Sequence, residues 1–417
     1  MVNEGNKMIT KNGFIWNTLG SLIYSFFNAI ILMFCTRLNG TEIAGIFSIC
    51  YATGCILNAI GDLGIRIFQV TDTNRKYKFE DYLYSRVFAV VAMLIASFVF
   101  TLISGYTNEK FFICMVLILI RVIDNFSESF QAEFQLDERL DLAGKALLYR
   151  NSLEIISFAI VDLITKNIYL SFIAMLITSI LILVFYDIRI LKKDNKFVKK
   201  FNFDKVKEIL KCCIPLGVST LISMYVINAV KYAIDMYGDN TMQTYFNVLY
   251  MPTFVINLVS ILIMKPLLKP FGEIWNNDSG KKFIKTIAYI LLFLVGITVI
   301  IEILALTIGI PILEWLYAIE LSEYRLELFL LILSGLFYAA STVIFYALGT
   351  IRKQKQTTIS YAICAIFALI ISNTLVKKYA ILGSTISSVL IMMLLFIILL
   401  IFFVVCYRKE IIKKDLK

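Results

Sequence analysis

The sequence predicts an all-α, polytopic integral membrane protein, with about twelve transmembrane helices in two six-helix lobes around a central cavity. Its composition is the first indication, because 59% of the 417 residues are hydrophobic and 17% are charged, with a mean hydropathy of +0.82. A soluble domain of this composition has too few polar residues to cover its surface. The second indication is a regular series of apolar stretches of about 18–25 residues, each long enough to cross a hydrocarbon core about 30 Å thick.

The apolar stretches divide the chain into twelve predicted spans joined by short connections, with no room for a soluble domain. The first stretch is too long for a signal peptide and lacks a small-residue cleavage site, so we interpret it as a span. The predicted spans are 13–36, 42–65, 87–105, 111–132, 147–165, 168–188, 213–236, 243–264, 286–309, 326–349, 357–376 and 380–406.

Basic residues gather in alternate connections between these spans. Of the 40 lysines and arginines, 32 lie at the two termini and in or at the edge of every second loop, six lie in the opposite loops, and two, Arg121 and Lys231, lie deep inside predicted spans. Because positive residues accumulate on the cytoplasmic side, we expect a multi-pass protein of the cell (inner) membrane with both termini in the cytoplasm. The formal charge of +10 therefore does not indicate a nucleic-acid partner.

The richest basic loop falls at the middle of the chain and predicts an N-terminal lobe (1–190), a cytoplasmic linker (191–211) and a C-terminal lobe (212–417). In the linker, Phe203, Val206 and Leu210 recur at helical spacing between lysines. This spacing favours either an amphipathic helix on the inner leaflet or a solvated linker. Asn28-Ala29 and Asn228-Ala229 recur at an offset of 200 residues, which indicates a parallel repeat. Transporters built from repeats place their substrate site between the halves.

Two strips of polar residues at helical spacing interrupt the apolar runs, one in each half. They are Arg121, Asp124 and Glu128 in the fourth span, and Asn228, Lys231 and Asp235 in the seventh, within INAVKYAID. A charge at the bilayer centre costs roughly 2.5–3.5 kcal/mol, and intramembrane charges usually serve a function. The alternative is that the opposite charges form pairs that merely tolerate burial. Two such strips predict a polar cavity. Asn17, Asn28, Asp62 and Glu154 either line it as well or make hydrogen bonds between helices.

Several other features bear on the chemistry. Pro252 falls mid-span and predicts a kink, whereas Pro215 fits the first turn of the seventh span. The chain contains no histidine and no GxxxxGK[ST] motif, and its eight cysteines lie in or beside apolar segments, which favours free thiols. No catalytic or metal-ligand set lies in a soluble loop, so we expect neither an enzyme nor a metal site or cofactor. A membrane glycosyltransferase is the enzyme alternative, and it normally needs a large acidic extramembrane loop.

Three segments together resemble the Wzx-type polysaccharide flippases of the multidrug/oligosaccharidyl-lipid/polysaccharide exporter superfamily. They are FIWNTLGSLIYSFFNAIILMFCTRLNGTEIAGIFSICYA, GDLGIRIFQVTD with YKFEDYLYSR, and IPLGVSTLISMYVINAVKYAID. The resemblance covers essentially the whole chain, although no single motif is diagnostic. The chain differs from the family pattern at Val230, where members of the family often have proline.

The resemblance implies a protein that moves undecaprenyl-pyrophosphate-linked oligosaccharides to the outer leaflet for O-antigen, capsule or related polymers. It also implies membrane lipids, a polysaccharide polymerase and glycosyltransferases as partners. Arg121 and Lys231 are then expected to bind the pyrophosphate, and Asn17, Asn28 and Asn228 the head group. The expected role of Asp62, Asp124, Glu128 and Asp235 is to balance charge or to carry a coupling H⁺ or Na⁺.

Two further functions remain open from the sequence. A cation-coupled antiporter of small molecules or drugs has the same fold in the same superfamily, but two intramembrane cations favour an anionic substrate. A non-transporting scaffold in a polysaccharide assembly complex would tolerate the loss of both cations. The sequence does not identify the sugars, the polymer, the energy source or the oligomeric state.

Overall fold

A computed structural model describes the chain except for residues 1, 73, 194–201, 278–279 and 416–417. The described residues form α-helices, π-helical turns and short connections without a β-strand, which confirms the predicted all-α class. They fall into two compact units, Met1–Met224 and Tyr225–Lys417. The division between the units falls within one helix, whereas the sequence places the lobe boundary in the linker 191–211, part of which lies outside the described residues. That placement stays a prediction.

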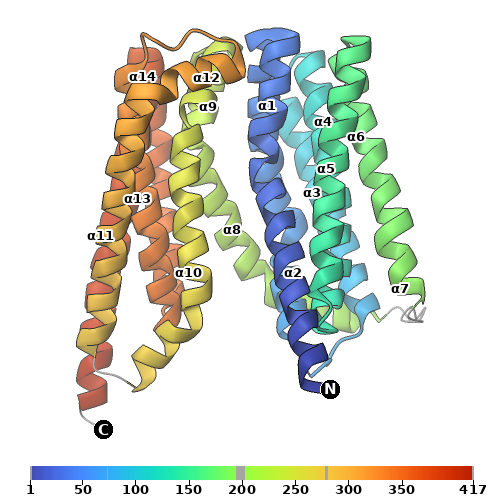
Figure 1. Ribbon diagram of the computed structural model, residues 1–417, viewed down its shortest axis with the longest axis vertical. Helices are drawn as coiled ribbons and strands as arrows, with labels where there is room; N and C mark the ends of the chain where they lie inside the picture. The colour runs from blue at the N-terminus through green and yellow to red at the C-terminus, as the bar shows by residue number, and fades with distance from the viewer. Residues whose placement is uncertain (1, 73, 194–201, 278–279, 416–417) are drawn as a thin grey trace. The chain divides into compact units, whose positions relative to one another are not determined.

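The first unit is a bundle of antiparallel helices in which α1 and α5 pack closely. Figure 1 shows the chain rising along the first part of α1 and returning along the second. The elements are α1 (Val2–Asp62), α2 (Ile65–Thr71), α3 (Phe79–Ile103), α4 (Asn108–Leu136), α5 (Leu140–Thr165), α6 (Ile168–Ile182), a π-helical segment (Leu183–Ile188), α7 (Arg189–Lys193) and the first part of α8 (Phe203–Tyr237).

The turn inside α1 depends on Gly40, which lies between the first two predicted spans. Its backbone has φ 85° and ψ 172°, a conformation that is essentially restricted to glycine. A Cβ atom at this position would meet nothing within 4 Å, so the requirement comes from the backbone and not from crowding.

We therefore expect Gly40→Ala to lower the free energy of unfolding by about 1–3 kcal/mol. The matched control is Gly296→Ala in the helix that follows α10, where a Cβ also meets nothing within 4 Å but the backbone is helical. There alanine should raise the free energy of unfolding by about 0.5–1 kcal/mol. Denaturation of the purified protein in mixed detergent micelles measures both changes, and equal effects of the same sign would contradict this role of Gly40.

The second unit contains the remainder of α8 and the helices that follow it. They are α9 (Asn240–Leu249), α10 (Met251–Asn277), α11 (Gly280–Leu304), a π-helical segment (Ala305–Gly309), α12 (Ile310–Tyr317), α13 (Arg325–Thr350) and α14 (Gln354–Asp415). α14 is interrupted at Ala380, where φ is 48° and ψ is −125°. Its two parts, like those of α1, correspond to two predicted spans, and α13 packs against α10 and α14.

The described residues contain seven helices that are long and apolar enough to cross a membrane, or eight if α9 and α10 form one bent span. Two of the seven, α1 and α14, each contain two predicted spans. α4 and α5 are not among the seven, because every stretch of eighteen residues within them carries at least three charged side chains. With these taken into account, the architecture of about twelve helices is confirmed.

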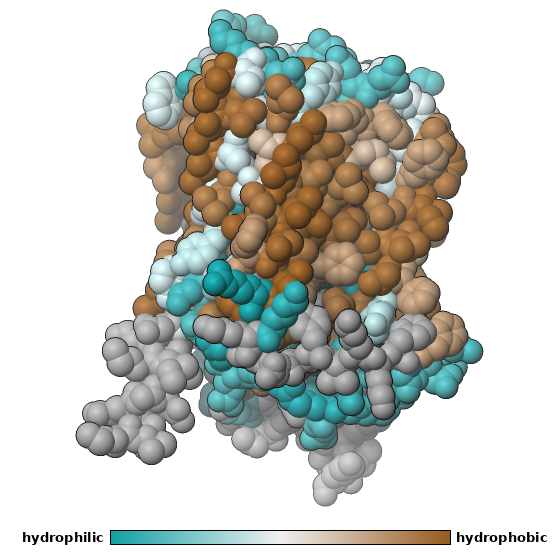
Figure 2. All heavy atoms as spheres, turned by 90° about the vertical axis from the view of Figure 1, so that its right-hand side faces the viewer, coloured by the Kyte–Doolittle hydropathy of each residue, from teal (hydrophilic) through white to brown (hydrophobic). Residues whose placement is uncertain are grey.

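The surface of the helices matches a lipid environment. Figure 2 shows a band of hydrophobic residues with hydrophilic residues at both of its ends. Within the first unit, α3 exposes Val91, Ile95, Phe98 and Leu102 at helical spacing along one face. Apolar side chains exposed in such a stripe are stable in contact with lipid and unfavourable in water.

The two prolines discussed above behave differently. The kink at Pro252 is confirmed: α9 ends at Leu249, α10 begins at Met251, and the two helices are bent by 43°. The placement of Pro215 in a first turn is wrong, because α8 begins at Phe203 and Pro215 lies inside it.

Residues 203–211 of the predicted linker are helical, as one of the two interpretations of their spacing predicts, but they form the first turns of α8 and not a helix of their own. Val206 and Ile209 are buried, and Ile209 packs with Ile65 and Tyr77 of the first unit. On the polar side, Nζ of Lys205 lies 3.6 Å from the Asp81 carboxylate. Val206 and Ile209 thus face protein, whereas Phe203 of the same apolar side is 57% exposed, a difference that helical spacing alone does not show.

Candidate functional site

The polar strip of α4 lies inside the first unit, facing the second half of α1. Arg121 is 8% exposed, and its Nη1 donates to Oδ2 of Asp124 at 3.1 Å. Its guanidinium lies over the ring of Tyr51, 4.9 Å from the centroid, and its Nη2 contacts the Cys55 sulfur at 3.7 Å. The predicted pairing of Arg121 with Asp124 is therefore present. The aromatic contact adds a further stabilising interaction to a buried cation.

A second buried arginine, Arg150 of α5, extends this pair into a network. Its Nη1 lies 3.4 Å from Oδ1 of Asp124, and its Nη2 lies 2.7 Å from Oδ2 of Asp187 in the π-helical segment. The Ser127 hydroxyl donates to the same Asp187 oxygen at 2.6 Å. Asp124 is thus shared by two guanidinium groups, and Arg150 by two carboxylates. The four charges balance, which is the condition for burying them at acceptable cost.

A small cavity lies beside this network and is lined by residues of α1, α4, α5 and α6. Its volume is about 10 Å³, close to the lower limit for one water molecule. Arg121, Asp124, Asn151 and Glu154 are its polar lining. Glu154 is 2% exposed, and its Oε1 has no hydrogen-bond partner among the described residues. An ionised carboxylate buried without a partner is unfavourable, so this oxygen is suited to hold a proton or to contact a ligand.

A third buried arginine explains the position of Asp62. Arg86 of α3 is fully buried, and its Nη1 donates to the carbonyls of Gly61 and Asp62 at 3.0 and 3.1 Å. The same atom lies 3.2 Å from Oδ1 of Asp62 and 2.9 Å from Oδ1 of Asn125. These carbonyls end α1, where the chain turns through Gly64 with φ 73°. Arg86 therefore holds the end of a helix, and Asp62 helps to neutralise it.

The other predicted site residues are distributed over both units. In the first, the Asn17 side chain is exposed, Glu128 is half-buried, and Oδ1 of Asn28 is buried without a hydrogen-bond partner among the described residues. The α8 strip belongs to the second unit, with Asn228 buried and Lys231 and Asp235 half-buried. The prediction that Arg121 and Lys231 face one cavity stays a prediction.

Sequence reasoning missed Arg86, Arg150 and Asp187. The count of basic residues assigns Arg86 to a loop and Arg150 to the edge of the span 147–165, but both lie well inside helices, because α3 begins at Phe79 and α5 at Leu140, eight and seven residues before the predicted spans. The hydropathy of a span falls at its first charges, so a charged turn inside a helix is easily mistaken for a loop. A usable signal was the i, i+4 spacing of Arg150 and Glu154, which places both on one face of α5.

Metal ligands are sparse in the described part of the chain, which contains no group of three or more Cys, Asp or Glu side chains able to hold a metal ion. The cysteines described there are free, and all but Cys55 and Cys212 are buried.

Comparison with known proteins gives a clear result for structure and none for sequence. No protein-family model matches the chain, and no curated protein matches it. The lipid II flippase MurJ in an inward closed conformation has a TM-score of 0.67 at 15% identity, covering 97% of this chain and 90% of its own. An inward-facing multidrug resistance MATE family transporter of the MOP superfamily has a TM-score of 0.65 at 14% identity, covering 93% and 94%.

A MOP superfamily transporter from Pyrococcus furiosus has a TM-score of 0.53 at 14% identity, covering 97% of this chain and 96% of that one. Similarity at this level of identity shows the fold. The chain has the helical architecture of these proteins over nearly its entire length.

Proposed function

We propose that the protein is a transporter of the MOP superfamily that flips undecaprenyl-pyrophosphate-linked oligosaccharides across the cytoplasmic membrane for surface polysaccharide synthesis. The fold it shares with MurJ and MATE transporters supports a transporter and disfavours an enzyme. The resemblance of its sequence to Wzx-type flippases supports the choice of substrate. In this proposal, the lobes rock by alternating access around a central cavity that contains Arg121 and Lys231, and both termini lie in the cytoplasm.

The observation that carries the proposal is that Arg121 lines the cavity of the first unit, whereas Arg86 and Arg150 do not. Nη1 of Arg86 contacts four oxygen atoms and Arg150 contacts three, although Nη2 of Arg86 and Nε of Arg150 have no hydrogen-bond partner among the described residues. Among the described residues, Arg121 donates to one oxygen, of Asp124, and contacts the sulfur of Cys55, although a guanidinium carries five N–H donors. Arg121 therefore keeps donors for a phosphate, which arginine binds through paired hydrogen bonds.

A cation-coupled antiporter of small molecules or drugs is the second candidate, and Glu154 favours it. A buried carboxyl oxygen without a partner, within the same cavity as Arg121, is suited to bind a proton or Na⁺ in one state and release it in another. The same group would serve a flippase driven by an ion gradient. We therefore propose Glu154 as a further coupling or charge-balancing residue, in addition to Asp124, Glu128 and Asp235.

The test is reconstitution of the native chain into proteoliposomes with a fluorescent undecaprenyl-pyrophosphate oligosaccharide, alongside Lys231→Ala and protein-free vesicles. We expect flipping by the native chain and at least tenfold slower flipping by the variant, because a hydrogen bond to a charged group contributes about 1.5–3 kcal/mol. The same vesicles are loaded with a cationic dye under a H⁺ or Na⁺ gradient. Gradient-driven dye movement without lipid flipping would favour the antiporter. If the protein moves neither the dye nor any lipid-linked oligosaccharide in a panel with different sugars, the scaffold is favoured. The lipid-linked oligosaccharide, polymerase and glycosyltransferases are the partners expected if the first outcome is obtained.

A further inference from the structure

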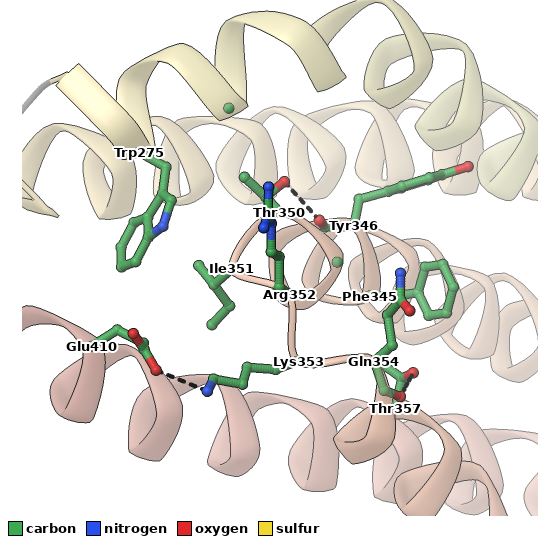
Figure 3. Close-up of a pocket in the computed structure, with 12 residues that line it drawn as sticks. Trp275, Phe345, Tyr346, Thr350, Ile351, Arg352, Lys353, Gln354, Thr357 and Glu410 are labelled. Carbon is green, nitrogen blue, oxygen red and sulfur yellow. Dashed lines mark hydrogen bonds and ion pairs between the residues drawn. The ribbon is translucent and has the colours of Figure 1, made fainter. Parts of the chain in front are cut away.

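A separate pocket lies at one end of the second unit, where α10, the C-terminal end of α13 and both ends of α14 meet. Its volume is about 990 Å³, in the range of sites that hold small molecules. Figure 3 shows Trp275 of α10 on one side, Tyr346 of α13 on another, and Lys353 and Glu410 below them. All of its lining residues belong to the second unit. The pocket is therefore distinct from the Arg121 cavity.

The turn between α13 and α14 presents Arg352 to this pocket. The N–H of Arg352 donates to the Gly349 carbonyl at 3.0 Å, and that of Lys353 to the Leu348 carbonyl at 2.9 Å. These two bonds define a Schellman motif, which ends a helix with a left-handed residue. Arg352 takes the left-handed position, with φ 59°, where glycine is usual. An arginine is thus held in a backbone conformation that is less favourable for it than for glycine.

The charge around the turn is unequally balanced. Lys353 is neutralised by Glu410, whose Oε1 lies 2.8 Å from Nζ. The Arg352 side chain is exposed and has no partner among the residues that the structure describes, and Figure 3 shows it pointing toward the α10 side of the pocket and away from Glu410. The first turn of α14, which begins at Gln354, adds the positive end of the helix dipole and N–H groups without helical partners, apart from that of Gln356, which donates to the Lys353 carbonyl at 3.2 Å. The pocket therefore carries a net positive charge with free donors.

The rim of the pocket is suited to a membrane surface. Trp275 and Tyr346 line it together with Phe345, which is 40% exposed. Tryptophan and tyrosine are enriched at the level of lipid head groups, and the pocket lies where helices end. The turn 351–353 belongs to the loops in which basic residues accumulate, so the positive-inside rule predicts that the pocket lies on the cytoplasmic face. Anionic phosphate head groups are concentrated there.

We propose that this pocket binds the phosphate group of a membrane lipid. The guanidinium of Arg352 donates hydrogen bonds to the phosphate, and the first turn of α14 is a second source of donors. Two lipids carry this chemistry: an anionic phospholipid and a polyprenyl diphosphate. The phosphate site is independent of the proposed transport function, whereas binding of the second lipid would make it a loading site for the substrate.

The test uses Arg352→Gly in the full chain, because glycine fits the left-handed position and removes only the side chain. Arg408→Ala is the matched control, since Arg408 is exposed near the C-terminal end of α14 and does not line the pocket. Native mass spectrometry in phosphatidylcholine nanodiscs measures the binding of added phosphatidylglycerol, polyprenyl diphosphate and inorganic pyrophosphate. Fluorescence of Trp275, in a chain with Trp16→Phe and Trp315→Phe, reports whether binding occurs at this pocket.

We expect at least tenfold weaker binding of one or both lipids to Arg352→Gly, unchanged binding to Arg408→Ala, and a lipid-dependent change in Trp275 fluorescence that Arg352→Gly abolishes. Preference for phosphatidylglycerol identifies a structural lipid, and preference for polyprenyl diphosphate a substrate. Equal binding to the native chain and Arg352→Gly would overturn the proposal. So would binding of inorganic pyrophosphate with no binding of either lipid.

Discussion

Replacing Arg150 by methionine is expected to lower the free energy of unfolding by about 3–5 kcal/mol. Arg150 is 2% exposed and lies 2.7 Å from Asp187, which is fully buried and has one further side-chain contact, from Ser127. Methionine fills a similar volume but leaves the Asp187 charge without a cation. Asp124 is less affected, because it keeps its ion pair with Arg121 at 3.1 Å. The loss of stability therefore comes mainly from the Asp187 carboxylate, which is left buried without a cation.

Two controls separate this explanation from a general loss of packing. Adding Asp187→Leu to Arg150→Met removes the stranded charge, so the double variant should recover at least half of the lost stability. Lys76→Met breaks an ion pair with Glu208 in which both side chains are exposed, and should cost no more than about 1 kcal/mol. Unfolding in mixed detergent micelles measures all three variants. If Arg150→Met costs no more than Lys76→Met, the network does not have the structural role assigned to it.

The sequence predicted the architecture because the membrane imposes a strong and simple pattern. Span length, the alternation of basic loops and the kink at Pro252 depend on local composition, and the structure contains the expected helices. For the same reason, the break at Gly40 lies between two predicted spans, and the break at Ala380 coincides with the first residue of the predicted span 380–406. Boundaries were less accurate where charges occur inside a helix, as at Arg86 and Arg150.

The site was predicted only in part, because the spacing of residues along one helix shows which side chains share a face of that helix but not which residues of other helices contact them. The spacing of Arg121 and Asp124 predicted their contact. The contact of Asp124 with Arg150, and of Arg150 with Asp187, joins residues 26 and 37 positions apart and depends on tertiary packing. The polar strip of α4 was thus visible in the sequence, whereas the network that makes part of it structural was not.

Arg121→Gln is expected to slow flipping of a lipid-linked oligosaccharide by about 10- to 100-fold, if the proposed function is correct, with little loss of stability. A hydrogen bond to a charged group contributes about 1.5–3 kcal/mol, and glutamine removes the charge while keeping a donor. The fold should tolerate the change because Asp124 keeps Arg150, 3.4 Å away. This separates Arg121 from Arg150, whose loss leaves a buried carboxylate unpaired.

The matched control is Lys110→Gln, the same change from a cation to an amide in the first turn of α4, where Lys110 lies outside the cavity and over the ring of Tyr106. Its flipping rate should equal that of the native chain. Initial rates in proteoliposomes and unfolding in micelles are measured on the same preparations. Arg121→Lys, which keeps the charge but not the planar donors, should fall between Arg121→Gln and the native chain. If Arg121→Gln loses stability as Arg150→Met does, or flips the lipid at the native rate, Arg121 is a structural residue and the phosphate must bind elsewhere.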